Sequence, residues 1–406
     1  MKSIVFLADG MADEPLPELN GKTPLEYANT PNMDFIARNG ANGLFVSLPE
    51  GFPTSSDVAN MSVLGYDLAQ YYPGRGPIEA VSQGIELKPD DIAFRCNLIT
   101  IKDDILTDYS AGHIDNSDST ELINFIQQKL GNEKVTFYPG VSYRNILVLS
   151  GNEFCPNVEC AKPDSCQGMK LFELPYKPLA NSKEAANTAS ILTELVSESR
   201  RLFAENELIK KKNLAVSAIW PHSPGRKPAF PKFSNLYSGK KGAIISAVDV
   251  IFGIGICAGM DIIKVPGATG FIDTNYEGKA DAAVKALEDH DFVYLHVEAI
   301  DECSHMGRLD LKLKAIEEFD SRIVGPVLNK LQNVKDISYA LLPDHPVPVK
   351  LRKHTRTPVP AAVMGPHIKP DSITFYSENE ASRGALGFIK DEELMKILMN
   401  LIKKPI

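Results

Sequence analysis

The chain lacks the features that mark several protein classes. It has no run near the roughly 18 apolar residues of a membrane span, and Asp9 ends the first apolar run too early for a signal peptide. Its six cysteines include no Cys-x-x-Cys pair, and a chain of 406 residues needs no disulfide staples. No basic stretch exceeds a few residues, and the formal net charge is −9. We expect a soluble, cytoplasmic protein with no membrane or nucleic-acid partner.

The pattern of apolar segments predicts two domains, one of them interrupted. At 44% hydrophobic residues, the chain can bury a large core. Alternating strand and helix patterns run from the start to about residue 68 and resume at about residue 182. Between them, short alternating strands and turns dominate. We therefore predict a doubly wound α/β domain over 1–68 plus 182–406, interrupted by a smaller α/β insert over 69–181.

Residues that commonly ligate metals follow short apolar runs in this sequence. Three such runs lead to Asp9, to Asp301, and to Asp344. In an open α/β sheet, chemistry gathers outside the carboxyl ends of the strands, so these side chains can converge although they lie far apart in the chain. The full candidate set comprises Asp9, Asp301, His305, Asp344, His345 and His354.

This mixed set of carboxylates and imidazoles suits two divalent ions such as Mn²⁺ or Zn²⁺ better than Ca²⁺, which prefers oxygen alone. Asp301 and His305 are four residues apart, which places both on one side of a helical turn. Two adjacent ions can hold both the attacking and the leaving oxygen of a displacement at phosphorus. Each short motif is weak alone, so separate capping aspartates and surface histidines remain the alternative.

A serine at a predicted helix start is the candidate nucleophile. The segment Ser55-Ser56-Asp57 precedes an apolar periodic stretch that ends at Gly65. Backbone N–H groups and the helix dipole stabilise a phosphoryl anion at such a position. On spacing alone, Ser55 and Ser56 fit this part equally well, and either could be a plain capping residue.

Several distinctive motifs follow one another along nearly the whole chain. They are Ala8-Asp9-Gly10-Met11, the segment from Ser56 to Asp67, Gly74-Arg75-Gly76-Pro77, Tyr143-Arg144-Asn145, Pro266-Gly267-Ala268-Thr269-Gly270, the segment from Asp273 to Lys279, and His296-Val297-Glu298-Ala299. In this order, these motifs resemble those of the archaeal-type, cofactor-independent phosphoglycerate mutases of the alkaline phosphatase superfamily.

The resemblance implies a role for each candidate ligand. Asp301, His305 and His354 would hold one metal ion. Asp9, Asp344 and His345 would hold the other, with Ser56 as the phosphorylated nucleophile beside it. The ions would be Mn²⁺ or Zn²⁺, with Mg²⁺ possible, and no 2,3-bisphosphoglycerate would be required. The insert would act as a lid that binds the glycerate part of the substrate.

Cationic side chains should bind the carboxylate and phosphate of such a substrate, and arginine is favoured for its bidentate geometry. Arg144 is the first candidate, followed by Arg226 and Lys227. His113 and Asp164 are candidates for proton transfer in the insert.

Two functions stay open at this point. The first is a mutase that interconverts 3-phosphoglycerate and 2-phosphoglycerate through a phosphoserine. The second is a homoserine kinase-like phosphotransferase that uses ATP, an activity proposed for one branch of the family. The mutase is the expected function. The segment from Cys160 to Cys166 lacks the histidine of the family's Pro-His-Asp run, which makes the kinase a serious rival. No Walker-type glycine loop is present, although bound metals could hold ATP phosphates. A non-catalytic metal-binding protein is a third hypothesis. The sequence does not predict the oligomeric state.

Overall fold

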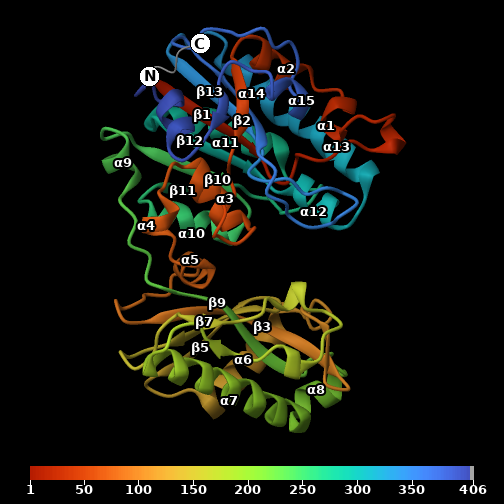
Figure 1. The fold of residues 1–406 in the computed structure, drawn as a ribbon, viewed down its shortest axis with the longest axis vertical. Helices are drawn as coiled ribbons and strands as arrows, with labels where there is room; N and C mark the ends of the chain where they lie inside the picture. The colour runs from red at the N-terminus through yellow and green to blue at the C-terminus, as the bar shows by residue number, and fades with distance from the viewer. Residues whose placement is uncertain (403–406) are drawn as a thin grey trace. The chain divides into compact units, whose positions relative to one another are not determined.

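The computed structural model describes residues 1–402, which form two compact units. The first, called the core domain here, comprises Met1–Tyr72 and the chain from Phe230 onward. The second, the insert domain, comprises Pro73–Ala229. In Figure 1 the red N-terminal strands and the blue C-terminal strands interleave within the core domain. No helix in the described part of the chain is both long and apolar enough to cross a membrane.

An eight-stranded mixed sheet forms the centre of the core domain. In sheet order its strands are β11 (Asp261–Lys264), β10 (Gly242–Ser246), β12 (Phe292–Val297), β1 (Lys2–Ala8), β13 (Ile337–Leu342), β14 (Val359–Met364), β2 (Ala41–Phe45) and β15 (Gly387–Ile389). The first five strands pair in parallel, and β14 runs antiparallel to both of its neighbours. Strands β1, β12 and β13 are almost wholly buried, as expected for parallel strands covered on both faces.

Helices cover both faces of this sheet, which confirms the doubly wound α/β prediction. Apolar side chains of α2, α11, α13 and α14 pack with Ile4 and Phe6 on one face. On the other face, Ser3 contacts Met399, which follows α16. The core-domain helices are α1 (Pro24–Tyr27), α2 (Pro31–Arg38), α3 (Ser56–Val63), α4 (Leu68–Tyr71), α9 (Phe233–Leu236), α10 (Asp249–Cys257), α11 (Tyr276–Asp289), α12 (Ala299–His305), α13 (Leu309–Phe319), α14 (Gly325–Leu331), α15 (Glu378–Ala381) and α16 (Glu393–Leu398).

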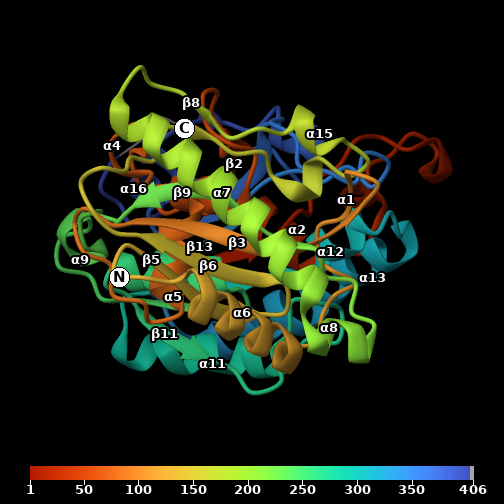
Figure 2. The same cartoon turned by 90° about the horizontal axis from the view of Figure 1, so that it is seen from below.

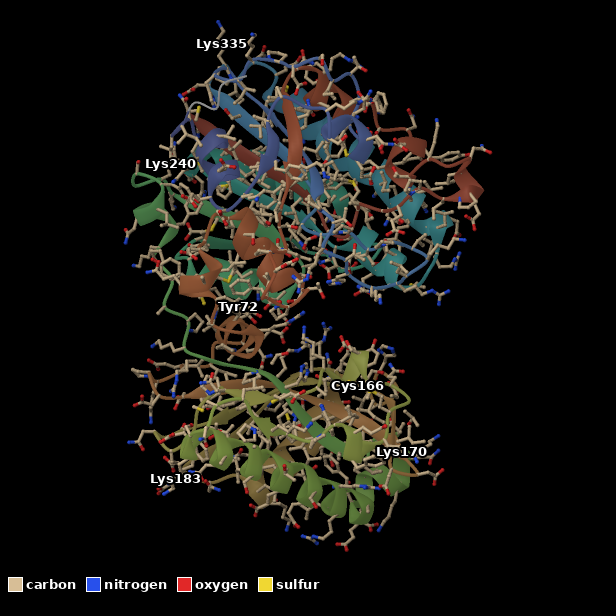
Figure 3. All side chains as sticks on the ribbon, in the orientation of Figure 1. Tyr72, Cys166, Lys170, Lys183, Lys240 and Lys335 are labelled. Carbon is tan, nitrogen blue, oxygen red and sulfur yellow. The ribbon has the colours of Figure 1, made fainter. Side chains whose placement is uncertain are left out.

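The insert domain has an antiparallel sheet with its two longest helices on one face (Figure 2). Its strands are β3 (Ile92–Lys102), β4 (Ile105–Asp108), β5 (Val135–Val141), β6 (Arg144–Leu149) and β9 (Ala218–Arg226), with β7 (Val158–Glu159) and β8 (Lys177–Pro178) as a separate pair. Its helices are α5 (Arg75–Ser82), α6 (Asn116–Leu130), α7 (Lys183–Glu205) and α8 (Glu207–Lys212). Exposed Lys183 marks the start of α7 (Figure 3).

The end of the insert differs from the predicted boundary. The sequence predicted that the insert ends at residue 181, whereas residues through Ala229 belong to the insert domain. The reason is packing: the apolar face of α7, including Leu192, Leu195 and Phe203, lies in one buried cluster with residues of β3. A helix pattern shows that such a face must be buried, but it does not show which sheet buries it.

Candidate metal centre

Three parallel strands bring the predicted ligands to one edge of the core-domain sheet. Strand β1 lies between β12 and β13, with Ala8 opposite Val297 and Leu7 opposite Leu342. Asp9 follows β1 directly, Asp301 lies in the first turn of α12 after β12, and Asp344 follows β13. All three aspartates therefore leave the sheet at its carboxyl-terminal edge, as the sequence predicted.

Asp301, His305 and His354 form the first ligand group. Each offers one ligand atom, and these atoms lie within 4.8 Å of one another. His305 Nε2 lies 3.4 Å from Asp301 Oδ2, and His354 Nε2 lies 3.6 Å from Asp301 Oδ1. The two histidine Nε2 atoms are 2.9 Å apart. Two imidazole nitrogens and a carboxylate directed at one point form a donor set that suits Mn²⁺ or Zn²⁺.

Asp9, Asp344 and His345 form the second group, which also includes Ser56. His345 Nε2 lies 3.5 Å from Asp9 Oδ1, 3.4 Å from Asp344 Oδ2 and 3.2 Å from Ser56 Oγ. Ligand atoms of Asp9, Asp301 and His345 also lie within 4.8 Å of one another, so the two groups adjoin. Ser56 is the first residue of α3, while Ser55 precedes the helix as its N-cap.

The chemistry of this cluster fits divalent cations. Burial, together with the negative charges of Asp344, Glu298 and Asp301, raises the pKa of Asp9 well above its ordinary value. The pKa of Asp301 is raised in the same way, first by burial and then by Glu298 and Asp344. Asp9 Oδ1 and Asp301 Oδ1 accept no hydrogen bond from the described residues. Buried carboxylates with unused oxygens are stabilised by bound cations.

His345 is also in the form that ligates metals. Burial and the neighbouring imidazoles of His354 and His305 lower the pKa of His345 well below its ordinary value, so its ring is neutral. A neutral imidazole has one nitrogen free to coordinate.

His296, at the end of β12, orients Asp9. Its Nε2 lies 3.0 Å from Asp9 Oδ2, and its Nδ1 lies 3.1 Å from Ser246 Oγ. The Ser246 hydroxyl also accepts from the main-chain N–H of Val248, so its proton is free for the imidazole. His296 Nε2–H can then donate to Asp9, which fixes the carboxylate that faces His345.

Two further residues of the site were not predicted from the sequence. Asn60 donates to Asp344, and Glu298 Oε2 lies 3.6 Å from His296 Nε2. Weak signals for both exist in the sequence. Asn60 lies one helical turn after Ser56 within an apolar stretch, and Glu298 directly follows β12.

Gly10 allows the loop after β1, which carries Asp9, to pass close to α12. A Cβ atom at this position would lie 2.7 Å from Asp301 Cα, and the residue has a φ of +66°. Both the contact and the left-handed conformation require glycine. The Asp9-Gly10 pair in the sequence is therefore a packing requirement of the site.

A cationic cluster occupies the face of the insert-domain sheet opposite α6 and α7. Strand pairing sets Arg95 opposite His222 and Asn97 opposite Arg144, while Phe94, Cys96 and Leu98 face the helices. Glu79 of α5 bridges Arg75 and Arg95, with Nε to carboxylate distances of 2.6 and 3.1 Å. Burial and the nearby positive charges of Arg95, Lys162 and Arg75 lower the pKa of His222 well below its ordinary value. Cations outnumber the single carboxylate, so this face can bind anionic groups.

The predicted substrate residues of the insert fall in different places. Arg144 lies in the cationic cluster, with its guanidinium 5.5 Å from the centre of the Tyr143 ring. The centre of the His113 ring lies 5.9 Å from the centre of the same Tyr143 ring. Arg226 instead donates to the main-chain oxygens of Asp90 and Phe154, at 3.1 and 3.3 Å.

Lys227 and Asp164 are both exposed. Asp164 Oδ1 accepts from the main-chain N–H of Ser165 at 2.9 Å.

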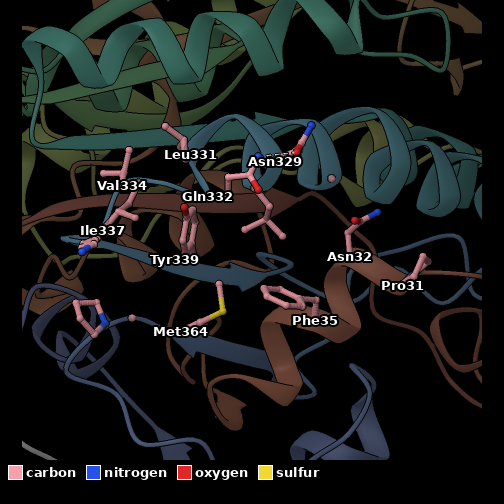
Figure 4. A pocket seen from close by; sticks show the side chains of 15 residues that line it. Pro31, Asn32, Phe35, Asn329, Leu331, Gln332, Val334, Ile337, Tyr339 and Met364 are labelled. Atoms are coloured by element: carbon pink, nitrogen blue, oxygen red, sulfur yellow. Dashed lines mark hydrogen bonds between the residues drawn. The ribbon is translucent and has the colours of Figure 1, made fainter.

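A cavity of about 590 Å³ in the core domain is unrelated to the ligand groups. Apolar residues of α2, α14, β13 and β14, among them Phe35, Leu331 and Met364, line it (Figure 4). It includes Ile337, which begins β13, whereas Asp344 follows the end of that strand. The cavity therefore lies at the opposite edge of the sheet.

Comparison with known proteins identifies the family. The sequence model described as 2,3-bisphosphoglycerate-independent phosphoglycerate mutase matches residues 37–208. A protein of Methanosarcina acetivorans with that name is 45% identical, over 99% of this chain and 100% of its own length. The Methanosarcina barkeri protein of the same name is 46% identical, over 98% of this chain and 99% of its own.

Solved structures agree with this comparison. A Pyrococcus horikoshii protein has a TM-score of 0.81 at 29% identity and covers 100% of this chain and 98% of its own. A cofactor-independent phosphoglycerate mutase from Thermoplasma acidophilum has a TM-score of 0.63 at 29% identity and covers 99% of both chains. Together with the full-length sequence identities, these matches show that the chain belongs to the 2,3-bisphosphoglycerate-independent phosphoglycerate mutase family.

Proposed function

We propose that the protein is a metal-dependent phosphoglycerate mutase that interconverts 3-phosphoglycerate and 2-phosphoglycerate through phosphorylated Ser56. The observation that carries this proposal is the position of Ser56 Oγ, 3.2 Å from Nε2 of His345, whose ligand atom lies within 4.8 Å of those of both Asp9 and Asp301. The names of the full-length relatives support the same activity.

In this proposal Asp301, His305 and His354 hold one divalent ion. Asp9, Asp344 and His345, together with Ser56 Oγ, hold the other. Mn²⁺ and Zn²⁺ both suit this mixture of nitrogen and oxygen donors. When bound, two such ions supply positive charge that lowers the pKa of a serine hydroxyl and neutralises phosphoryl oxygens.

The reaction consists of two in-line transfers through one oxygen. Ser56 Oγ loses its proton and attacks the phosphorus of 3-phosphoglycerate, the bond from phosphorus to the C3 oxygen breaks, and the C3 oxygen takes up a proton. The C2 hydroxyl of the glycerate then loses its proton and attacks the phosphorus of phosphoserine, the bond from phosphorus to Ser56 Oγ breaks, and Oγ takes up a proton. The N–H groups at the start of α3 favour negative charge at Ser56 throughout.

The insert domain supplies cations for the anionic parts of the substrate. We assign the glycerate carboxylate to the cluster around Arg144, Arg95 and Arg75, because guanidinium groups bind carboxylates in a bidentate manner. Glu79 keeps two of these guanidinium groups in fixed positions. His113, near Tyr143, stays the candidate for proton transfer at the glycerate oxygens.

A parallel assay tests this function. The purified protein, loaded with Mn²⁺, is incubated with 3-phosphoglycerate alone and, separately, with ATP and homoserine. We expect 2-phosphoglycerate in the first reaction and loss of that product when a chelator removes the metal. Phosphohomoserine in the second reaction, without mutase activity in the first, would replace this proposal with the kinase function.

A further inference from the structure

Lys312 of α13 is a buried lysine close to the candidate metal centre. Its side chain is 0% exposed, and its ammonium group has three protons to donate. The three nearest acceptors are Asp13 Oδ2 at 2.7 Å, the Val347 main-chain oxygen at 2.9 Å and the Gly10 main-chain oxygen at 3.2 Å. Every proton of this buried ammonium thus has an acceptor.

These acceptors belong to the two loops that carry the second ligand group. Gly10 follows Asp9 directly, and Val347 lies two residues after His345. The loops also contact each other, because the main-chain N–H of Val347 donates to the Ala12 oxygen at 3.2 Å. Lys312 therefore joins the segment after β1 to the segment after β13 at a point next to the ligands.

Asp13, the partner of Lys312, also joins the two loops. Its Oδ2 accepts from the main-chain N–H of Val349 at 3.0 Å, and its own N–H donates to Glu378 Oε1 at 3.1 Å. The Lys312–Asp13 pair is therefore hydrogen-bonded to both loops, and through the Asp13 main chain to Glu378 of α15. It is buried on both sides, with 0% side-chain exposure for Lys312 and Asp13.

We infer that Lys312 is a positioning residue that sets the affinity of the second ligand group for its divalent ion. Among the described residues, the Lys312 ammonium donates no hydrogen bond to a ligand side chain, and all of its acceptors lie in the two ligand loops. It therefore acts on the second group through the separation between the Asp9 loop and the Asp344-His345 loop. Metal affinity depends on holding donor atoms within a narrow range of distances. This inference rests on the metal centre of the proposed function.

The test compares metal binding in folded protein among three variants. Lys312→Met removes the ammonium but keeps an unbranched apolar chain. Lys312→Met/Asp13→Asn removes both charges, and the asparagine oxygen can still accept from Val349, so no unpaired charge is buried. Lys314→Met is the matched control, because Lys314 lies on the same helix, is 61% exposed and is 3.8 Å from Glu318.

Metal-stripped protein is titrated with Mn²⁺, and electron paramagnetic resonance reports free ion and the coupled signal of two neighbouring ions. Circular dichroism confirms that each variant is folded at the temperature of the titration. We expect both Lys312 variants to raise the dissociation constant of one ion at least tenfold and to weaken the coupled signal. Lys314→Met should stay within twofold of the unaltered protein.

The outcomes separate this inference from the proposed function. If the unaltered protein binds two Mn²⁺ ions and folded Lys312 variants bind them equally well, Lys312 only supports the fold and the inference is wrong. If the unaltered protein binds no Mn²⁺, the metal centre and the inference both fail. If Lys312→Met does not fold, the Mn²⁺ affinity of the double variant tests the inference in its place.

Discussion

The side-chain amide of Asn60 donates to Asp344 Oδ2 and to the main-chain oxygen of Ser56, each at 2.8 Å. The hydroxyl of Tyr294 donates to Asn60 Oδ1 at 2.5 Å, which fixes the orientation of the amide. One buried side chain thus links the proposed nucleophile, a proposed metal ligand and β12. Asn60 and Asp344 are separated by 284 residues in the chain.

Asn60→Ala should lower mutase turnover by about 10–100-fold, because outer hydrogen bonds to metal ligands commonly contribute this much. Steady-state kinetics and Mn²⁺ titration measure the change, and we expect weaker metal binding as well. Ser62→Ala is the control on the same helix, since within residues 1–402 its hydroxyl bonds only to the Val58 main-chain oxygen. Equal losses in both variants would assign the effect to the stability of α3.

Ser56→Ala should lower turnover by several orders of magnitude, since both phosphoryl transfers use its oxygen. Mass spectrometry of the unaltered protein after incubation with 3-phosphoglycerate should find phosphate on Ser56. Ser55→Ala should have little effect on turnover. Its buried hydroxyl has no hydrogen-bond partner among the described residues, so its removal should not lower stability. Near-normal turnover in Ser56→Ala would rule out the phosphoserine mechanism.

Asp301→Asn and His354→Ala should each reduce the number of tightly bound Mn²⁺ ions from two to one and abolish most activity. Each variant removes one donor from the first ligand group, in which the three ligand atoms lie within 4.8 Å of one another. Metal analysis after dialysis measures the stoichiometry, and circular dichroism checks the fold. Unchanged stoichiometry in both variants would contradict the assignment of these residues.

Arg144→Ala should raise KM for 3-phosphoglycerate at least tenfold, because removing one guanidinium–carboxylate pair commonly costs about 1.5–3 kcal/mol. Mn²⁺ affinity should not change, since Arg144 lies in the insert domain. Lys227→Ala serves as the control from the same domain, with an exposed cation outside the cationic cluster. A KM that rises equally in both variants would indicate a general charge effect.

Glu378 makes stability depend on pH. Burial raises its pKa from 4.5 to about 7, although the Thr23 hydroxyl donates to it. The folded protein then holds this proton more tightly than the unfolded chain does. The stabilising contribution is complete below about pH 4.5 and is lost as the pH rises through about 7.

Glu378→Gln should therefore remove this dependence and stabilise the protein at pH 8 relative to the unaltered chain. The limit is about 1.4 kcal/mol for each unit of pKa shift. Chemical unfolding in the presence of chelator, at pH 5 and pH 8, measures the difference between the two proteins. Exposed Glu50, replaced by Gln, provides the control. A difference that is the same at both pH values would show that Glu378 does not titrate in this range.

The ends of the strands could be predicted from the sequence because apolar runs and the residues that follow them are local features. The helical spacing of Asp301 and His305 likewise predicted the turn that α12 contains. Choosing Ser56 over Ser55 from the residues alone was impossible, since both lie at the start of α3. The choice depends on which hydroxyl faces His345, a residue 289 positions away.

The burial of Lys312 could have been predicted from the sequence. It lies on the buried stripe of α13 with Ala315, Ile316 and Phe319, where a lysine is unusual. The periodicity indicates that this lysine is buried, but its partner Asp13 lies in a loop without a repeating pattern. Arg226 is a case in which the sequence holds no signal. An arginine that binds a substrate and one that binds two main-chain oxygens cannot be told apart from the sequence.

The position of β1 between β12 and β13 also constrains how the chain can fold during its synthesis. Its two neighbours begin at Phe292 and Ile337, and the insert domain is complete at Ala229. At about 5–20 residues per second, β1 waits roughly 15–60 s for its first neighbour. The insert domain, with a buried apolar cluster of its own, can form in that interval. Strand β1 therefore leaves the ribosome long before either of its neighbours, and its apolar residues need protection until the first of them emerges.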